Sequence, residues 1–353
     1  MKKFCMEFGL SMAVCLVLVG LFNWYVDPFF HYHEPLTGLN TYLYNQVYQT
    51  PGLAENFTYD SAIVGSSMTE NFRVSWFQEW GYHTVKISYS GARTLDLNII
   101  LNKVYESDNE VKLIVIDLND FQLTTDARLQ FANQPQYLYQ DHWWDDTLYL
   151  WNRDVFLSSL GSVMACVTNY RVDIDDSYTW EDPALFSIEK VKESCEDYID
   201  NLKFQIQNNI GEEYDGEQEY QYCAENLQNL TIVVQEHPET QFYFYLPPYS
   251  ILYWEEQILT GRLDTILGVY QIAMETLLQY DNVRVFYFQD EEQFITDLSN
   301  YRDVCHHTPA INRYIFECMR DGKGEVFSSN VGKHIENTKN IATNYCYEDI
   351  WRE

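Results

Sequence analysis

The longest apolar run in the chain lies near its start, at residues 8–26, and contains no charged residue. About twenty such residues suffice to cross a bilayer as a helix. Trp24 and Tyr25 stand at the far end of the run, where aromatic side chains often anchor a helix at the membrane surface. No small-x-small cleavage signature follows, so the pattern favours an uncleaved membrane anchor over a removed signal peptide.

Two lysines, Lys2 and Lys3, precede this run. Positive residues flanking a span usually remain in the cytoplasm, so residues 1–7 are expected to form a cytoplasmic tail. The remainder of the chain is then expected outside the cytoplasm, with a single-pass anchor in the cell membrane. Residues 27–58 are rich in aromatic residues and read as a loop-like collar. Residues 59–353 read as the main domain.

Beyond the collar, short apolar runs alternate with longer segments of helical periodicity. The predicted strands are 62–64, 84–88, 112–117, 241–246 and 283–288. The predicted helices are 68–80, 94–105, 223–236, 257–280 and 310–320. This alternation predicts βαβ units. The predicted strand 112–117 contains a continuous apolar run, 113–116, as in strands buried inside a parallel sheet. The fold class is therefore predicted as α/β.

The alternation breaks at about residues 122–222, a segment rich in Tyr, Trp, Asp and Asn. We interpret this segment as a large insertion packed on the core, serving as a lid or a substrate platform. Its tryptophans Trp143, Trp144 and Trp151 are expected to form the core of the insertion, with a sugar-stacking surface as the alternative.

The 353 residues carry a formal net charge of −31, with 53 acidic and 22 basic side chains. Such a surface repels nucleic acid, which argues against DNA or RNA as a partner. The eight cysteines include no CxxC pair and no Cys/His cluster with zinc spacing. Structural disulfides or buried thiols are therefore expected instead of a metal site.

The first strand ends abruptly at Gly65-Ser66-Ser67, directly before a predicted helix. A glycine here allows a tight or left-handed turn. A serine after it would project from the carboxyl end of a strand beside a helix N-terminus, where an α/β protein places a nucleophile. The alternative is that Ser66 or Ser67 merely caps the helix.

Other polar residues follow the remaining strands in the same way. Gly91 follows the second strand, Asn119 the third, and Asp303 and His306 the fifth. A serine nucleophile needs a base within hydrogen-bond reach and a third group that orients the base. An Asp and a His three residues apart in one turn can supply both, and the Gly91 N–H and the Asn119 amide could donate to an oxyanion. Taken singly, Gly91 and Asn119 are as readily turn residues, Asp303 a helix cap and His306 a partly buried polar side chain.

In order and strand context, these residues resemble the SGNH (GDSL-like) hydrolase superfamily, over residues 59–119 and 241–320. The closest likeness is to its membrane-anchored bacterial branch, the DltD-like and alginate-acetylation-like proteins. The resemblance implies a flavodoxin-like three-layer α/β/α sandwich with a five-stranded parallel sheet of order 2-1-3-4-5. It implies no metal and no organic cofactor.

The resemblance also implies roles for individual residues. Ser67 would be the nucleophile, His306 the general base and Asp303 its orienting partner. The N–H groups of Ser67 and Gly91 and the side chain of Asn119 would form the oxyanion hole.

Three positions depart from the family pattern. Ser66 replaces the usual Asp of the turn, and Asp117 stands where the third block usually has Gly. His307 follows His306 in place of an apolar residue and offers a second candidate base, although its spacing from Asp303 is less suitable.

Together these features predict an extracytoplasmic serine esterase or O-acyltransferase acting on acyl esters of cell-envelope or exported polysaccharide. Water as second substrate would give hydrolysis, and a sugar hydroxyl would give transfer. A membrane-bound polysaccharide-modification protein is the expected partner. The alternative is a catalytically inactive protein of the same fold that binds glycans through its aromatic insertion.

Overall fold

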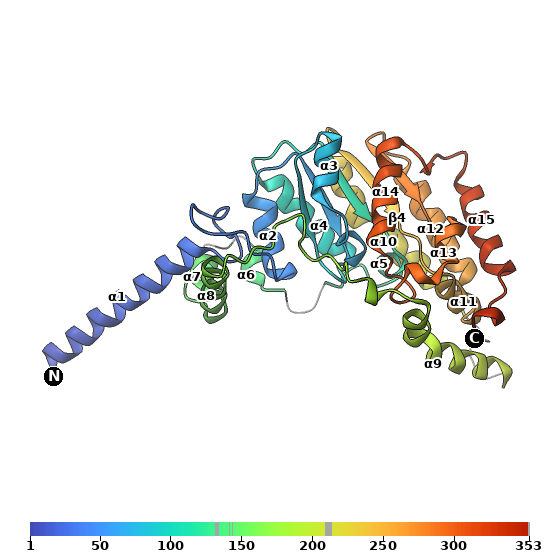
Figure 1. The fold of residues 1–353 in the computed structure, drawn as a ribbon. Helices are drawn as coiled ribbons and strands as arrows, with labels where there is room; N and C mark the ends of the chain where they lie inside the picture. Colours follow the sequence, from blue (N-terminus) through green and yellow to red (C-terminus); the bar gives the residue numbers. More distant parts are fainter. Residues whose placement is uncertain (131–133, 141, 143, 209–213, 352–353) are drawn as a thin grey trace.

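The computed structural model describes residues 1–130, 134–140, 142, 144–208 and 214–351. A long N-terminal helix, α1 (Lys2–Val26), projects from an α/β domain, as Figure 1 shows. Most of α1 is exposed, and it is the one helix among the described residues that is long and apolar enough to cross a membrane. The predicted α/β class and the N-terminal apolar helix are thus confirmed.

The domain is built on one mixed sheet of six strands in the order β2-β1-β3-β4-β5-β6. The strands are β1 (Ser61–Gly65), β2 (Thr84–Ser88), β3 (Leu113–Asp117), β4 (Gln241–Leu246), β5 (Val283–Tyr287) and β6 (Glu325–Val326). β1 to β5 pair in parallel, whereas β6 pairs with β5 in antiparallel fashion. The expectation of a purely parallel five-stranded sheet was therefore wrong at this edge. β6 has only two residues, too few for a recognisable apolar run, and the bond from Arg284 Nε to Glu325 Oε1 (2.8 Å) supports its pairing.

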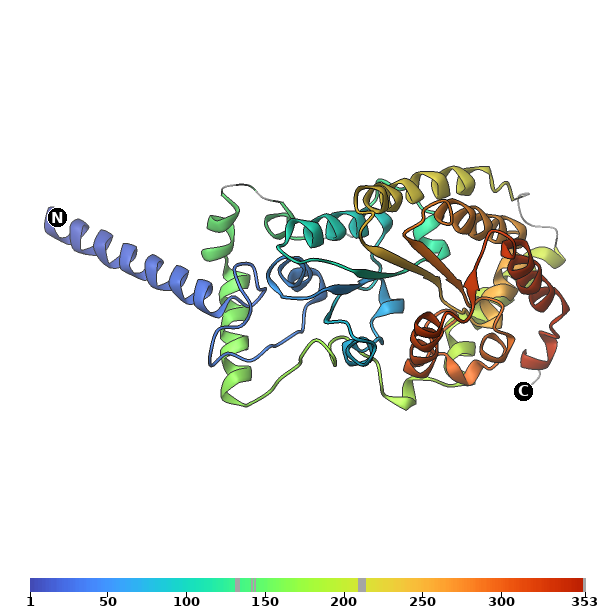
Figure 2. The same cartoon turned by 90° about the horizontal axis from the view of Figure 1, so that it is seen from above.

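Helices cover both faces of the sheet (Figure 2). One face carries α2 (Gln46–Asn56), α4 (Thr94–Glu106), α10 (Glu217–Glu236), α11 (Ile251–Leu259), α12 (Leu263–Leu277) and α15 (Val331–Asn344), and the other carries α3 (Val74–Trp80) and α14 (Pro309–Asp321). Successive strand residues point to opposite faces, so Val64 joins the first apolar cluster and Ile63 the second. Burial on both faces explains the unbroken apolar run in the central strand β3.

The predicted helix 68–80 is interrupted. A short 3₁₀ turn, η1 (Ser67–Thr69), is followed by irregular chain before α3 begins at Val74. The buried Lys86 Nζ donates to the carbonyls of Glu70 (2.8 Å) and Phe72 (3.0 Å). The lysine thereby satisfies backbone groups that a continuous helix would have used.

The collar is not a loop throughout, because it contains α2 with Pro51 inside it. Proline lacks an N–H and leaves the carbonyl four residues earlier without its helical donor. The Tyr139 hydroxyl donates to this carbonyl, that of Val47, at 2.6 Å. The predicted helix 257–280 also differs from the structure, because the segment forms two helices, α11 and α12. They are separated at Gly261, which has a φ of +74°.

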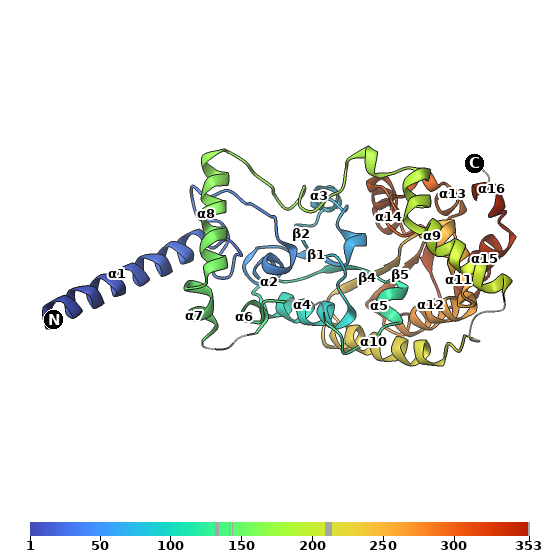
Figure 3. The same ribbon diagram turned by 90° about the horizontal axis from the view of Figure 1, so that it is seen from below.

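The segment between β3 and α10 does not form one compact insertion. It contains α5 (Asp120–Leu123), α6 (Gln136–Tyr139), α7 (Asp145–Leu150), α8 (Arg153–Val167), η2 (Pro183–Leu185) and α9 (Ile188–Gln207). α7 and α8 pack on α1, whereas α9 packs on α11 at the other end of the domain (Figure 3). Residues 168–187, here called the strap, connect the two ends and pass α3 and α14 on the way. The remaining short elements are α13 (Glu292–Ile295), η3 (Leu298–Asn300) and α16 (Glu348–Trp351).

Candidate active site

Ser67, His306 and Asp303 form one hydrogen-bonded chain. Ser67 begins η1 directly beyond β1, and the other two lie in the loop between η3 and α14. The Ser67 Oγ lies 2.8 Å from His306 Nε2, and His306 Nδ1 lies 2.8 Å from Asp303 Oδ2. In this arrangement Nδ1–H donates to the carboxylate and Nε2 can accept the serine proton.

The Asp303 carboxylate is fixed by its own loop. Its Oδ1 accepts from the backbone N–H groups of Cys305 (3.0 Å) and His306 (2.8 Å). Burial alone would raise the pKa of Asp303, but its hydrogen bonds and the charge of His306 outweigh burial and hold this pKa below the ordinary value. The carboxylate therefore stays ionised at neutral pH and can stabilise an imidazolium at His306.

His307, the second candidate base, points elsewhere. Its side chain is buried, with Nδ1 3.3 Å from the Thr308 carbonyl, and its Nε2 has no hydrogen-bond partner in the described part of the chain. Burial lowers the pKa of His307 to about 4. His306 is thus the histidine that the structure brings to Ser67.

The turn before Ser67 is held by Asp117 at the end of β3. The Asp117 carboxylate accepts from the Ser66 backbone N–H (2.7 Å) and the Ser66 hydroxyl (2.6 Å). Gly65 is needed for space and not for a left-handed backbone, since a Cβ there would lie 2.1 Å from Asp117 Oδ1. Ser66 is the capping residue of η1, which leaves the Ser67 hydroxyl to His306.

Of the three predicted oxyanion donors, two are available. The N–H groups of Ser67 and Gly91 donate to nothing within the described ranges, and Gly91 has the φ of +76° that favours glycine. The Asn119 amide donates to Asp117 Oδ2 at 3.0 Å and makes a longer, 3.4 Å contact with Ser66 Oγ. One Asn119 hydrogen is therefore committed to the turn, and the other is only weakly held.

These residues share one cavity of about 430 Å³ at the carboxyl ends of the strands. Its walls include Ser67, Gly91, Asn119 and His306. The lining also includes residues that the sequence did not indicate, among them Glu70, Phe121, Trp180, Tyr249 and Arg302. The lining thus combines a basic group, a buried carboxylate and aromatic rings around the candidate nucleophile.

Trp180 reaches the site from the strap. Its ring meets that of His306 edge-on, with centroids 4.9 Å apart, and the Arg302 guanidinium lies 5.0 Å from the Trp180 ring centre. Its Nε1–H donates to Glu70 Oε2 at 2.7 Å. The strap therefore forms one wall of the site and limits the positions that the imidazole can take.

Glu70 is a buried carboxylate three residues after Ser67. Besides Trp180, it accepts hydrogen bonds from Gln46 Nε2 (2.6 Å) and Ser90 Oγ (2.7 Å). Burial raises the pKa of Glu70, although these hydrogen bonds oppose the rise. In the sequence, the only signal for a role of Glu70 is the Ser67-x-x-Glu70 spacing, which resembles a capping box.

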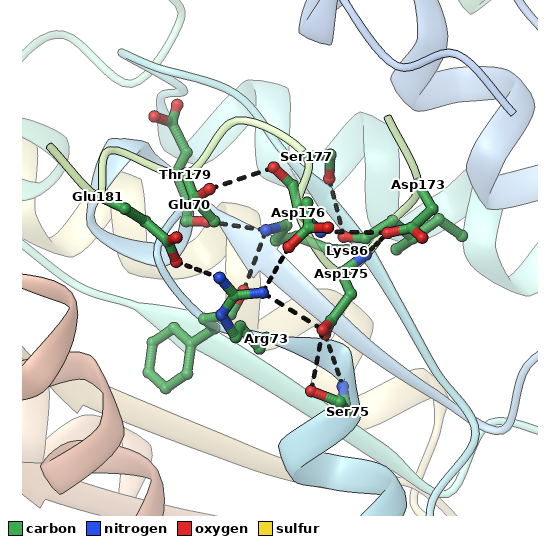
Figure 4. Close-up of polar contacts among 12 residues, drawn as sticks. Glu70, Arg73, Ser75, Lys86, Asp173, Asp175, Asp176, Ser177, Thr179 and Glu181 are labelled. Carbon is green, nitrogen blue, oxygen red and sulfur yellow. Dashed lines mark hydrogen bonds and ion pairs between the residues drawn. The ribbon is translucent and has the colours of Figure 1, made fainter. Parts of the chain in front are cut away.

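Arg73 clamps the strap to the loop after the nucleophile (Figure 4). Its Nη1 donates to Asp176 Oδ1 (2.5 Å) and lies 3.4 Å from Asp175 Oδ2, and its Nη2 pairs with Glu181. The Asp175 carboxylate also accepts from the backbone N–H of Ser75 at 2.8 Å. These contacts surround the Trp180 backbone, whose N–H donates to Asn71.

Neither Trp144 nor Trp151 lines this cavity, and both side chains are exposed, so the expectation that they form the core of the insertion was wrong for these two. Trp143 lies outside the described residues, and Trp144 is exposed. The Trp151 indole donates to the Leu16 carbonyl of α1 instead. Within the described residues no group of three or more His, Cys, Asp or Glu side chains could hold a metal ion, and all eight cysteines are unpaired.

Comparison with known proteins adds no identification. No protein-family model matches the chain, and no curated protein matches its sequence.

Proposed function

We propose that this protein is a serine esterase or O-acyltransferase of the SGNH type. The observation that carries the proposal is the Ser67–His306–Asp303 chain, with both hydrogen bonds at 2.8 Å and the serine facing a cavity. A residue that only capped η1 would not need an oriented histidine at its hydroxyl.

In the proposed reaction, the Ser67 Oγ attacks the acyl carbonyl carbon while His306 Nε2 takes the serine proton. The carbonyl oxygen becomes an oxyanion facing the N–H groups of Ser67 and Gly91. Loss of one such donor typically costs about 3–4 kcal/mol of transition-state stabilisation. As the intermediate collapses, His306 protonates the departing alkoxide and an acyl-serine ester remains.

The second half returns the enzyme to its starting state. Water or a sugar hydroxyl attacks the acyl-serine, His306 takes its proton, and the Ser67 alkoxide leaves and is reprotonated by His306. Water gives hydrolysis and a sugar hydroxyl gives transfer. The aromatic rings of Phe121, Trp180 and Tyr249 suit a carbohydrate, which has apolar ring faces.

The fold supports the assignment. The five parallel strands follow the order β2-β1-β3-β4-β5, and β6 adds one antiparallel strand at the edge. We take this core to be the flavodoxin-like sandwich of the SGNH family.

The location proposed for the domain is outside the cytoplasm, tethered by α1 with Lys2 and Lys3 on the cytoplasmic side. Acyl esters of cell-envelope or exported polysaccharide are the proposed substrates, and a membrane-bound polysaccharide-modification protein is the proposed partner.

The decisive experiment is fluorophosphonate labelling of the full chain in nanodiscs. Wild type and Ser66→Ala should label, and Ser67→Ala should not. Labelling that survives Ser67→Ala but is lost in Ser66→Ala would show that Ser66 is the nucleophile. A folded wild type that never labels would instead favour the inactive, glycan-binding alternative. Turnover of p-nitrophenyl acetate with and without an acceptor oligosaccharide then separates hydrolysis from transfer.

A further inference from the structure

Helix α8 has the reverse of the usual surface pattern. The residues that it exposes to the outside are large and apolar. They are Leu157, Leu160, Met164 and Val167, with exposed fractions of 55%, 46%, 61% and 76%. Spacings of three, four and three residues place them on one side of the helix, here called the α8 stripe. The buried side carries small residues such as Ser159, Ser162 and Ala165. No charged side chain occurs between residues 155 and 167.

The α8 helix runs across the end of α1 in both Figure 2 and Figure 3. The two helices are joined at the last turns of α1. The Ser159 hydroxyl donates to Asn23 Oδ1 at 3.0 Å, and the ring centroids of Phe22 and Phe156 lie 5.7 Å apart. If α1 stands along the membrane normal, α8 lies parallel to the membrane plane.

The buried side of α8 faces the collar. The Asn40 backbone N–H donates to Cys166 Sγ, and Ser162 lines a small cavity with Pro28 and Leu39. Ser162 and Cys166 stand opposite the α8 stripe on the helix. The stripe therefore faces away from the collar and toward the side from which α1 leaves the domain.

Trp151, between α7 and α8, reaches further along α1. Its indole N–H donates to the Leu16 carbonyl at 2.8 Å, and its ring packs over Gly20. Leu16 lies seven residues before Asn23, which corresponds to about 10 Å of helix. The corner between α7 and α8 thus lies level with residues of the apolar run of α1.

We propose that α8 is an interfacial helix, with its stripe immersed at the surface of the bilayer that α1 crosses. The proposal depends on α1 being a membrane span and is independent of the proposed catalysis. Interfacial helices bury their apolar face about 5–10 Å into the boundary between head groups and acyl chains. The stripe is uncharged and the protein carries a net charge of −31, so apolar burial and not anionic lipid holds it there. Together α1 and α8 fix the orientation of the domain on the membrane.

The test places an environment-sensitive fluorescent amino acid at position 160 of the full chain in nanodiscs of zwitterionic lipid. The control carries the same residue at Gln218, an exposed position on α10. We expect blue-shifted emission at 160, with loss of fluorescence when nitroxide lipids are added, and neither change at 218. High salt should not reverse the effect at 160. The same probe at Met164 provides a second position if the first variant fails to fold.

Two outcomes would overturn the proposal. Emission at 160 and 164 like that of a probe in water would show that the stripe is solvated. Blue-shifted emission without nitroxide quenching would show that protein covers the stripe. Photo-crosslinking from position 160 would then separate a second copy of this chain from a different membrane protein.

Discussion

The carboxylate of Asp117 holds Ser66 at two atoms, its backbone N–H and its hydroxyl. Asp117 ends β3 and Ser66 follows β1, so two neighbouring strands together build the turn that presents Ser67. Ser66 and Asp117, the two residues at which the sequence differs from the SGNH pattern that it resembles, thus contact each other. The turn depends on that carboxylate remaining where it is.

Substitution of Gly65 tests this dependence. In Gly65→Ala the new Cβ would lie 2.1 Å from Asp117 Oδ1 and 2.6 Å from Thr69 Cγ2. Overpacking of this kind typically costs about 1–3 kcal/mol. We expect a lower melting temperature and weak fluorophosphonate labelling. Gly332→Ala, in a helix with open space around it, is the control and should be neutral or slightly stabilising. Equal melting temperatures for the two variants would contradict the packing account.

Asp303→Asn tests the orienting role. An asparagine at 303 has only one accepting oxygen for His306 Nδ1–H, because its NH2 group can only donate. It is also neutral and cannot balance the charge of an imidazolium. The equivalent change in a serine protease lowers kcat by about 10⁴. We expect a loss of similar order in p-nitrophenyl acetate turnover, with KM much less affected. A fall of less than about tenfold with the fold intact would remove Asp303 from the mechanism.

Arg73→Ala should release the strap. Without the guanidinium, the carboxylates of Asp175, Asp176 and Glu181 lose the ion pairs that tie them to the loop after Ser67. We expect faster proteolysis within residues 168–187 and slower turnover, because Trp180 no longer confines His306. Arg128→Ala, which removes an exposed pair with Asp126, is the matched control and should change neither. If both variants are cleaved at the wild-type rate, Arg73 is not the clamp.

His307 predicts a specific pH dependence of stability. Its pKa of about 4 lies below the ordinary 6.5, so the unfolded chain binds the proton first as pH falls. Stability from this residue is therefore complete above pH 6.5 and is lost between pH 6.5 and 4, by about 3 kcal/mol in all. In His307→Gln the melting temperature should fall less steeply over this window. The exposed His83→Gln should follow wild type, and a slope unchanged in His307→Gln would exclude His307 as the cause.

Local sequence was enough to place part of the site. The Gly65–Ser67 turn and the Asp303/His306 loop each consist of neighbouring residues, and the alternation of strands and helices indicated that both belong at the carboxyl ends of strands. The structure brings them together as that alternation suggests.

Other residues could not be recognised as site residues from the local sequence, because distant segments position them. Trp180 is held beside His306 by contacts of the strap with Arg73 and Asn71. Glu70 is held by hydrogen bonds from Gln46, Ser90 and Trp180. Pro51 reads as a helix breaker, yet a tyrosine hydroxyl from residue 139 replaces the missing donor. Such compensation cannot be seen along the chain.

The packing of α7 and α8 on α1 has a practical consequence for making a soluble form. Cutting after Val26 would discard the surfaces that Trp151, Phe156 and Ser159 contact, and would leave α8 without its support. No helix lies between the end of α8 at Val167 and Trp180. A displacement of α8 would therefore also displace Trp180, which forms a wall of the site. A soluble form therefore needs to retain α1 from Leu16 onward, with its outward leucines and those of α8 exchanged for polar residues.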